Sequence, residues 1–133
     1  MKLVPTEHDA QVAYFDWVRA MRERDERYWH IYAIPNAGKR SKAAGRWYLA
    51  EGLMPGYPDI NVDVPVRDDL GEVKRCGLRI EHKRKGAKLT DKQKQVLSRI
   101  KKCGFFEVAV CYSTDELVLT TLRYLASDEK ITK

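Results

Sequence analysis

The sequence has few cysteines, and they follow no recognisable pattern. Cys76, Cys103 and Cys111 are odd in number, and none belongs to a Cys-x-x-Cys pair. Neither a disulfide framework nor a structural zinc site is therefore expected. Unpaired cysteines are typical of a reducing compartment, so we expect the protein in the cytoplasm.

Long apolar runs and targeting signals are also missing. No uninterrupted apolar stretch is long enough to cross a bilayer, and the N-terminus lacks the basic, apolar and small-residue order of a signal peptide. The chain has 133 residues, of which 44% are hydrophobic and 33% are charged. This composition predicts a globular protein with no membrane partner. We expect a single domain over residues 1–133 with a frayed tail over residues 128–133.

Positive charge exceeds negative charge and is unevenly distributed. The net charge is +6, and the segment 74–94 carries nine basic side chains against two acidic ones. Such clustering is the electrostatic footprint of a polyphosphate ligand such as DNA. A solvated, lysine-rich face would give the same pattern, so both interpretations stay open. The candidate DNA-binding residues are Lys39, Arg40, Lys42, Arg46, Arg84, Lys85 and Lys88.

The first half of the chain alternates helical and extended patterns. Thr6 is a candidate cap for a helix whose apolar residues recur at helical spacing as far as Met21. The segment 28–34 is rich in aromatic and β-branched residues and predicts a strand. A basic helix is expected over residues 39–50, with Trp47 in the core.

The second half predicts a crossover connection. Thr90 and Gln93 form a capping box for a helix that ends at Gly104. A strand over residues 105–111 carries little charge and is expected inside the sheet, and Ser113 begins a last helix. A helical crossover suits a parallel strand pair, so the order of elements predicts an α/β fold with a mixed sheet flanked by helices.

Residues 51–83 predict a β-hairpin that concentrates charge. Apolar residues alternate from Ile60, a polar turn follows at residues 68–71, and the returning strand ends at Glu81-His82-Lys83. Antiparallel pairing about this turn places Asp59 opposite Glu81 or Lys83. Two carboxylates and an ammonium on a half-buried sheet are costly unless they serve a ligand. Around Mg²⁺ or Mn²⁺ they have an ordinary use, because these cations take one or two carboxylates and accept phosphate oxygens.

These residues carry a family resemblance. Pro58-Asp59 followed by Glu81-x-Lys83 resembles the signature of PD-(D/E)xK nucleases. The segment 51–60, Glu-Gly-Leu-Met-Pro-Gly-Tyr-Pro-Asp-Ile, and the block Leu-Thr-Asp-Lys-Gln at 89–93 are similar to those of the VRR-NUC family within it. The resemblance spans about residues 7–112. It implies a restriction-endonuclease-like αβββαβ core, and stand-alone members of the family are of phage or bacterial type, which would place the protein in a bacterial or phage-infected host cell.

The resemblance also implies roles for individual residues. Asp59, Glu81 and the main-chain carbonyl of His82 would hold Mg²⁺ or Mn²⁺, and Lys83 would position the attacking water. Two further residues have competing interpretations. Glu7 would be an additional acid and possible metal ligand, but an acid in the first turn of a helix also favours the helix dipole. Gln93 would belong to the active site, but the capping box alone explains its presence.

The resulting functional hypothesis is a metal-dependent, structure-specific DNA endonuclease. The resemblance implies activity like that of a Holliday-junction resolvase on branched DNA, and a homodimer. Paired cuts in a two-fold symmetric substrate also require paired sites. Two alternatives stay open at this stage. The chain could cut flaps or damaged duplex as part of a larger complex, or it could be a non-catalytic basic DNA-binding module.

Overall fold

The computed structural model describes residues 5–34 and 42–130. The first part forms α1 (Glu7–Arg22), the 3₁₀ helix η1 (Glu26–His30), β1 (Ile31–Ala33) and α2 (Lys42–Ala50). The second part forms β2 (Ile60–Val62), β3 (Val66–Arg67), β4 (Val73–Arg75), β5 (Gly77–His82), α3 (Asp91–Cys103), β6 (Phe106–Cys111) and α4 (Thr114–Ala126). Within these ranges, no helix has the length and apolar character needed to cross a membrane.

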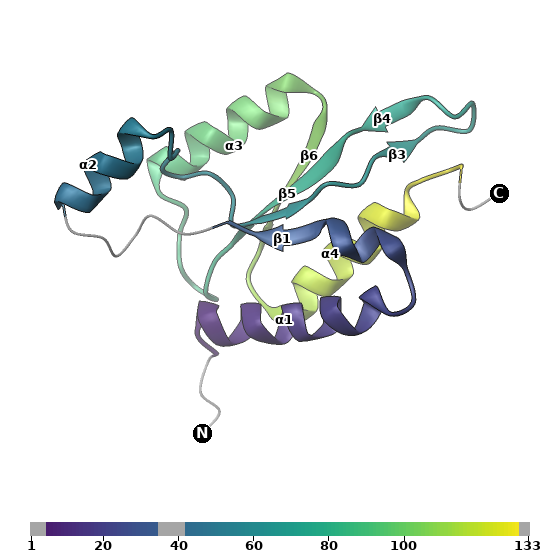
Figure 1. Cartoon of the computed structure of the whole chain (residues 1–133), viewed down its shortest axis with the longest axis horizontal. Helices are drawn as coiled ribbons and strands as arrows, with labels where there is room; N and C mark the ends of the chain where they lie inside the picture. Colours follow the sequence, from purple (N-terminus) through teal and green to yellow (C-terminus); the bar gives the residue numbers. More distant parts are fainter. Residues whose placement is uncertain (1–4, 35–41, 131–133) are drawn as a thin grey trace.

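A four-stranded mixed sheet forms the centre of the molecule (Figure 1). Its strand order is β1-β2-β5-β6, in which β2 pairs antiparallel with both β1 and β5. Strand β6 pairs parallel to β5, after the crossover through α3. The predicted α/β fold with a mixed sheet is confirmed, and the elements α1, β1, β2, β5, α3 and β6 follow the expected αβββαβ order.

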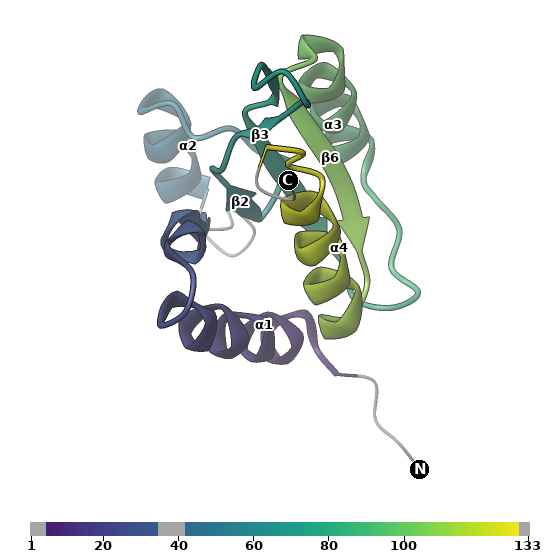
Figure 2. The ribbon, with the colours of Figure 1, turned by 90° about the vertical axis from the view of Figure 1, so that its right-hand side faces the viewer.

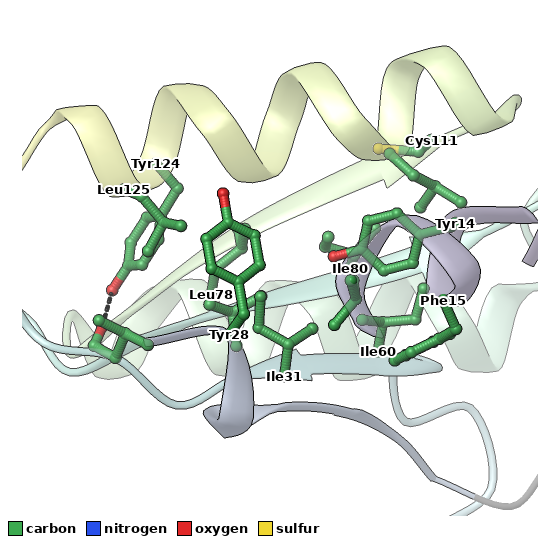
Figure 3. Packing of buried hydrophobic residues seen from close by; sticks show 14 of the residues in the cluster. Tyr14, Phe15, Tyr28, Ile31, Ile60, Leu78, Ile80, Cys111, Tyr124 and Leu125 are labelled. Carbon is green, nitrogen blue, oxygen red and sulfur yellow. Dashed lines mark hydrogen bonds between the residues drawn. The ribbon is translucent and has the colours of Figure 1, made fainter. Parts of the chain in front are cut away.

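The helices cover both faces of this sheet (Figure 2). Side chains of α1, η1 and α4 form one buried cluster with every second residue of the strands. The cluster includes Tyr14 of α1, Tyr28 of η1, Tyr124 of α4 and Ile80 of β5 (Figure 3). The buried residues of α3 lie outside that cluster, so α3 covers the opposite face. Neighbouring residues of β5 therefore serve different layers: Ile80 packs in the core and Glu81 faces α3.

Two buried tyrosines in the cluster retain hydrogen bonds. The Tyr124 hydroxyl donates to the main-chain oxygen of Val64 at 2.6 Å (Figure 3). The Tyr14 and Thr121 hydroxyls lie 2.8 Å apart. These bonds avoid the cost of burying an unpaired hydroxyl, and they tie α4 to α1 and to the loop after β2.

The predicted helix ends are confirmed. The Thr6 side chain accepts the Asp9 N–H at the start of α1. Thr90 and Gln93 form a reciprocal capping box on α3, which ends at Gly104 in the left-handed conformation. Ser113 caps α4.

Three predicted features of the strands are wrong or incomplete. The Asp25 side chain accepts the Arg27 N–H and caps a 3₁₀ helix, so the expected strand over residues 28–34 is reduced to β1. Strand β6 lies at an edge of the sheet. It carries little charge because α3 and α4 cover its two faces, and not because it lies between two other strands. The expected hairpin splits into β2 with β5 and a separate β3–β4 ribbon, because Pro65 between β2 and β3 has no N–H to donate.

Two further predictions concern Trp47 and the chain end. Trp47 is 66% exposed in α2, so its expected place in the core is wrong. The expected frayed tail begins too early, because Asp128 is buried. Its Oδ1 accepts the N–H of Arg67, and the Glu129 N–H donates to the Arg67 oxygen. Residues 131–133 lie outside the described part.

Candidate active site

The register of β2 and β5 brings Asp59 and Glu81 together. Ile60 pairs with Ile80 and Val62 with Leu78, so the next position beyond this ladder sets Asp59 opposite Glu81, one of the two expected pairings. Asp59 Oδ2 accepts the His82 N–H at 2.8 Å, where the β2–β5 main-chain pairing ends. Glu81 Oε1 accepts a hydrogen bond from Gln93 Nε2 at 3.0 Å. We call Asp59 and Glu81 the carboxylate centre.

Burial and mutual repulsion control the protonation of this centre. Burial, and then the neighbouring Asp59 carboxylate, raise the pKa of Glu81 to about 8, against a smaller lowering by the Lys83 charge. Burial also raises the pKa of Asp59, although the His82 N–H stabilises its charged form. The two carboxyl groups are close enough for a hydrogen bond when one of them holds a proton. With both ionised, the Lys83 charge offsets the repulsion within the pair only in part.

The residues present fit a divalent cation. Glu81 is only 2% exposed, and its Oε2 accepts no hydrogen bond from any of the described residues. A buried carboxylate oxygen without a donor is costly, and a bound cation would remove that cost. Among residues 5–34 and 42–130, no group of three or more His, Cys, Asp or Glu side chains is arranged to hold a metal. Two carboxylates supplemented by main-chain oxygen and water suit Mg²⁺ or Mn²⁺ better than zinc.

Glu7 reaches the same centre from the start of α1. Its Oε1 accepts the Arg84 N–H at 3.0 Å, which ties the first turn of α1 to the chain just after β5. Its charge contributes to the raised pKa values of both Asp59 and Glu81. As a first-turn acid it also complements the helix dipole, whereas among the described residues it is not arranged with Asp59 and Glu81 as a third metal ligand.

Gln93 makes hydrogen bonds that suit both of its interpretations. Its side-chain oxygen accepts the Thr90 N–H at 2.9 Å, which completes the capping box, while its Nε2 donates to Glu81. The amide thus uses one end for the helix and the other for the carboxylate. The start of α3 thereby fixes the orientation of Glu81.

Lys83 and the His82 carbonyl lie at the end of β5. Lys83 follows Glu81 by two residues on the same face and lowers the pKa of Glu81 through its charge. The N–H and carbonyl of one strand residue point toward the same neighbouring strand. Because the His82 N–H donates to Asp59, the His82 carbonyl is directed to the side of Asp59. The His82 ring occupies the other face, where burial lowers its pKa and Nδ1 lies 3.4 Å from Gln11 Oε1.

Sequence reasoning missed the anchor of the loop that carries Asp59. Arg79 is 8% exposed, and its Nε donates to the Tyr57 hydroxyl at 3.1 Å. Its Nη1 pairs with Asp63 at 2.8 Å, and its guanidinium lies over the Phe106 ring. The signal was available, because Arg79 shares the face of Glu81 by strand periodicity. Gly56 adds a second anchor. At φ +82° it packs against Lys92, and a Cβ at this position would lie only 3.2 Å from the Lys92 main chain.

The candidate DNA-binding residues divide into two groups. Arg84, Lys85 and Lys88 are exposed in the loop after β5, next to the carboxylate centre. Arg46 is exposed on α2. Lys42 begins α2, whereas Lys39 and Arg40 lie outside the described residues.

A pocket of about 790 Å³ opens beside the carboxylate centre. Glu7, Asp59 and Arg84 line one end of it. The acids therefore face a space large enough for part of a nucleotide chain, with a basic residue at its rim. Such an arrangement can bind a cation and a phosphate side by side.

Comparison with known proteins agrees with the geometry. The VRR-NUC domain model matches residues 6–115. A solved structure described as a VRR_NUC domain protein superposes with a TM-score of 0.74 at 22% identity, over 94% of this chain and 92% of that chain. No curated protein matches. The structural likeness supports the fold, and the domain match shows the family: this chain belongs to the VRR-NUC family of PD-(D/E)xK nuclease domains, whose function is nuclease-type processing of DNA.

Proposed function

We propose that the protein is a metal-dependent, structure-specific DNA endonuclease with activity like that of a Holliday-junction resolvase. The single observation that carries this proposal is the carboxylate centre, in which the buried Glu81 Oε2 lies beside a second carboxylate and has no donor within the described part of the chain. A structural ion pair would have filled that position with a donor. A cation-binding site leaves it open to the ion.

Each residue of the candidate active site has a separate role in the proposed hydrolysis of a phosphodiester bond. Asp59, Glu81 and the His82 carbonyl would hold Mg²⁺ or Mn²⁺, with Glu7 as a possible further ligand. The bound ion would lower the pKa of a coordinated water and polarise the scissile phosphate. Lys83 positions the attacking water and offsets charge that develops on the phosphate. Gln93 keeps Glu81 in place through its hydrogen bond.

The proposed substrate is branched DNA bound by a homodimer. The net charge of +6 and the exposed basic loop after β5 support binding of the phosphate backbone. Two-fold symmetric junctions require two cuts, which a pair of identical subunits can supply.

The test is a cleavage panel. Purified protein is incubated with labelled four-way junction, flap and linear duplex, with Mg²⁺, Mn²⁺ or chelator. We expect metal-dependent cutting, preferentially of the junction, and none with chelator. Asp59→Ala should abolish cutting with unchanged or higher DNA affinity, because a negative charge near the phosphate is removed. Glu26→Gln neutralises an exposed acid at the start of η1 and is the matched control.

The other outcomes are equally informative. Preference for a flap or a damaged duplex would replace the junction in the proposal and keep the chemistry. Binding without cleavage under every metal would overturn the enzymatic proposal and favour a DNA-binding module. Loss of both cutting and binding in Asp59→Ala would indicate misfolding, which circular dichroism would reveal.

A further inference from the structure

A second, smaller pocket adjoins the one beside the carboxylate centre. Its volume is about 240 Å³. Three segments line it: the start of α1, the end of β5 with the loop that follows, and the start of α4. Glu7 and Arg84 line both pockets, so the two spaces are neighbours. We call the smaller space the helix-start pocket.

Two helix N-termini meet at the helix-start pocket. Thr114 Oγ1 donates to the Ala10 main-chain oxygen at 3.0 Å, which holds the start of α4 against the first turns of α1 (Figure 2). The cap residues Thr6 and Ser113 each accept one N–H of the first turn of their helix. The N–H groups of the first two residues in each helix have no partner within that helix. Both helix ends therefore offer main-chain donors and a positive dipole end to an anion.

A buried side chain of the lining also lacks a partner. His82 lines the pocket and is 2% exposed, and its Nε2 has no hydrogen-bond partner among the described residues. An unpaired polar atom at this depth is costly, and a ligand that bonds to it removes the cost. The other ring nitrogen, Nδ1, lies 3.4 Å from Gln11 Oε1. Rotation of the Gln11 amide would bring its NH₂ group to Nδ1 and leave the proton of the neutral ring on Nε2, where it can be donated to a ligand oxygen.

The charges of the lining favour an anion. Arg84 and Lys85 are exposed in the loop after β5, and both line the pocket. Glu7 is the acid of the lining, and its Oε1 accepts the Arg84 N–H. Asp115 and Glu116 belong to the first turn of α4 but are exposed to solvent outside the lining, where water and salt screen their charge. Two cationic side chains and two helix ends thus face one carboxylate.

We propose that the helix-start pocket binds a backbone phosphate of the DNA close to the phosphate that is cut. This inference rests on the proposed nuclease function and adds a second phosphate contact to it. Bonds to phosphates fix the register of a protein on DNA, so this contact would align the scissile phosphate with the carboxylate centre. The apolar surface of Pro5, Ala10 and Tyr112 suits the attached sugar. No base pair has to open, so the site is compatible with the paired arms of a four-way junction.

The test is a phosphate scan of DNA binding in chelator, so that no cleavage is needed. The cut is first mapped with Mg²⁺. Single phosphates around it are then replaced, one at a time, by neutral methylphosphonate, and fluorescence anisotropy measures the affinity for each junction. We expect a sensitive position within about three nucleotides of the cut, at which the replacement weakens binding about tenfold.

Two variants of Thr114 link the sensitive position to the pocket. Thr114→Glu places a carboxylate in the lining, and Thr114→Gln is its neutral counterpart of similar size. Both lose the hydrogen bond to Ala10, so they differ in charge alone. On the unmodified junction, Thr114→Glu should bind about tenfold more weakly than Thr114→Gln. On the junction with methylphosphonate at the sensitive position, the two should bind equally, because the repelled charge is gone.

Two lysines of one loop give the matched control. Lys85 lines the pocket, whereas Lys88 is exposed in the same loop outside the lining. Lys85→Gln should remove the sensitivity at that position. Lys88→Gln should weaken binding of every junction by a similar factor and leave the sensitivity in place. This comparison does not depend on the Thr114 variants, whose folding is checked by circular dichroism.

Three results would overturn the pocket proposal. The first is equal affinity of Thr114→Glu and Thr114→Gln for the unmodified junction. The second is a difference between them that persists on every methylphosphonate junction, which would indicate repulsion without a local phosphate contact. The third is retained sensitivity in Lys85→Gln. Failure of the nuclease proposal is separate: wild-type protein would cut nothing, and a scan outward from the branch point would still reveal the sensitive phosphate.

Discussion

The carboxylate centre and helix α2 differ most clearly in how firmly the rest of the chain holds them. Asp59 and Glu81 are each held by a hydrogen bond from another segment, and the loop that leads to Asp59 is anchored by Arg79. No described side chain of α2 is buried, although the helix carries Trp47, Tyr48 and Leu49. Sheet register can therefore fix costly charges in place, while apolar content alone does not bring a helix into the core.

The largest expected effect concerns chemistry at the centre. Glu81→Gln keeps the size of the side chain but removes the charge that would hold the ion. We expect cleavage to fall by about a thousandfold or more, equivalent to about 4 kcal/mol in the barrier. The metal-free protein should become more stable, because a buried charge beside Asp59 is removed. Cleavage rates and urea unfolding measure the two effects.

A cleavage rate within tenfold of the wild-type rate would contradict a role of Glu81 in metal binding. A substitution in α2 should instead affect DNA binding and leave the chemical step unchanged. Arg46→Gln removes an exposed charge there and should leave single-turnover chemistry at saturating DNA unchanged, while it weakens binding.

The next prediction concerns the free energy of unfolding when an apolar side chain is shortened in β5 or in α2. Ile80 is fully buried in the core beneath Glu81, whereas Leu49 is half exposed. Ile80→Ala should lower the free energy of unfolding by about 2–5 kcal/mol, because it removes apolar contacts and leaves a cavity. Leu49→Ala should change the free energy of unfolding by no more than about 0.5 kcal/mol. Urea titrations at one pH test both, and similar losses would show that α2 is packed in solution.

A third effect is the pH dependence of the metal-free protein. The pKa of Glu81 is raised from 4.5 to about 8, so the folded state binds a proton more tightly than the unfolded state. The contribution of the protonated Glu81 side chain to the free energy of unfolding is fully present below pH 4.5 and is lost as pH rises through about 8. Its size is on the order of a few kcal/mol, since each pKa unit corresponds to about 1.4 kcal/mol. Urea unfolding at intervals between pH 5 and 9 measures it.

Magnesium should reverse this trend. The proposed ion would bind the ionised carboxylates, so the increase in melting temperature on addition of Mg²⁺ should grow with pH over the same range. The Glu81→Gln variant should show neither the loss of stability with pH nor the gain with Mg²⁺. A magnesium effect that is independent of pH would place the ion elsewhere.

The sequence predicted the carboxylate centre better than the surrounding elements, for a physical reason. The sequence predicted that Asp59 lies opposite Glu81 or Lys83, and the structure selects Glu81. The prediction survives the break of the hairpin at Pro65, because β2 and β5 still pair about the expected centre. Helix caps are also local signals, so the capping box at Gln93 was readable.

Other features depend on contacts that a local pattern does not contain. The segment 28–34 has strand composition, yet the cap at Asp25 and the burial of Tyr28 make its first half a 3₁₀ helix. Trp47 is a large apolar residue of the kind that usually packs in a core, but its side chain is 66% exposed on α2. Arg79 resembles an ordinary basic residue until Tyr57 and Asp63 are brought to it.

The smallest expected effects come from substitutions of Gln93, whose side chain links the carboxylate centre to the start of α3. Two variants distinguish its hydrogen bond to the Thr90 N–H from its hydrogen bond to Glu81. Gln93→Glu keeps an acceptor for the Thr90 N–H but loses the donor to Glu81, whereas Gln93→Ala loses both. We expect Gln93→Ala to lose about 0.5–1 kcal/mol of stability from the cap, and Gln93→Glu to keep the cap. Both should slow cleavage about tenfold, because Glu81 loses the group that orients it. Full activity in Gln93→Glu would show that the amide serves the helix alone, and that the order of the carboxylate centre comes from the strands.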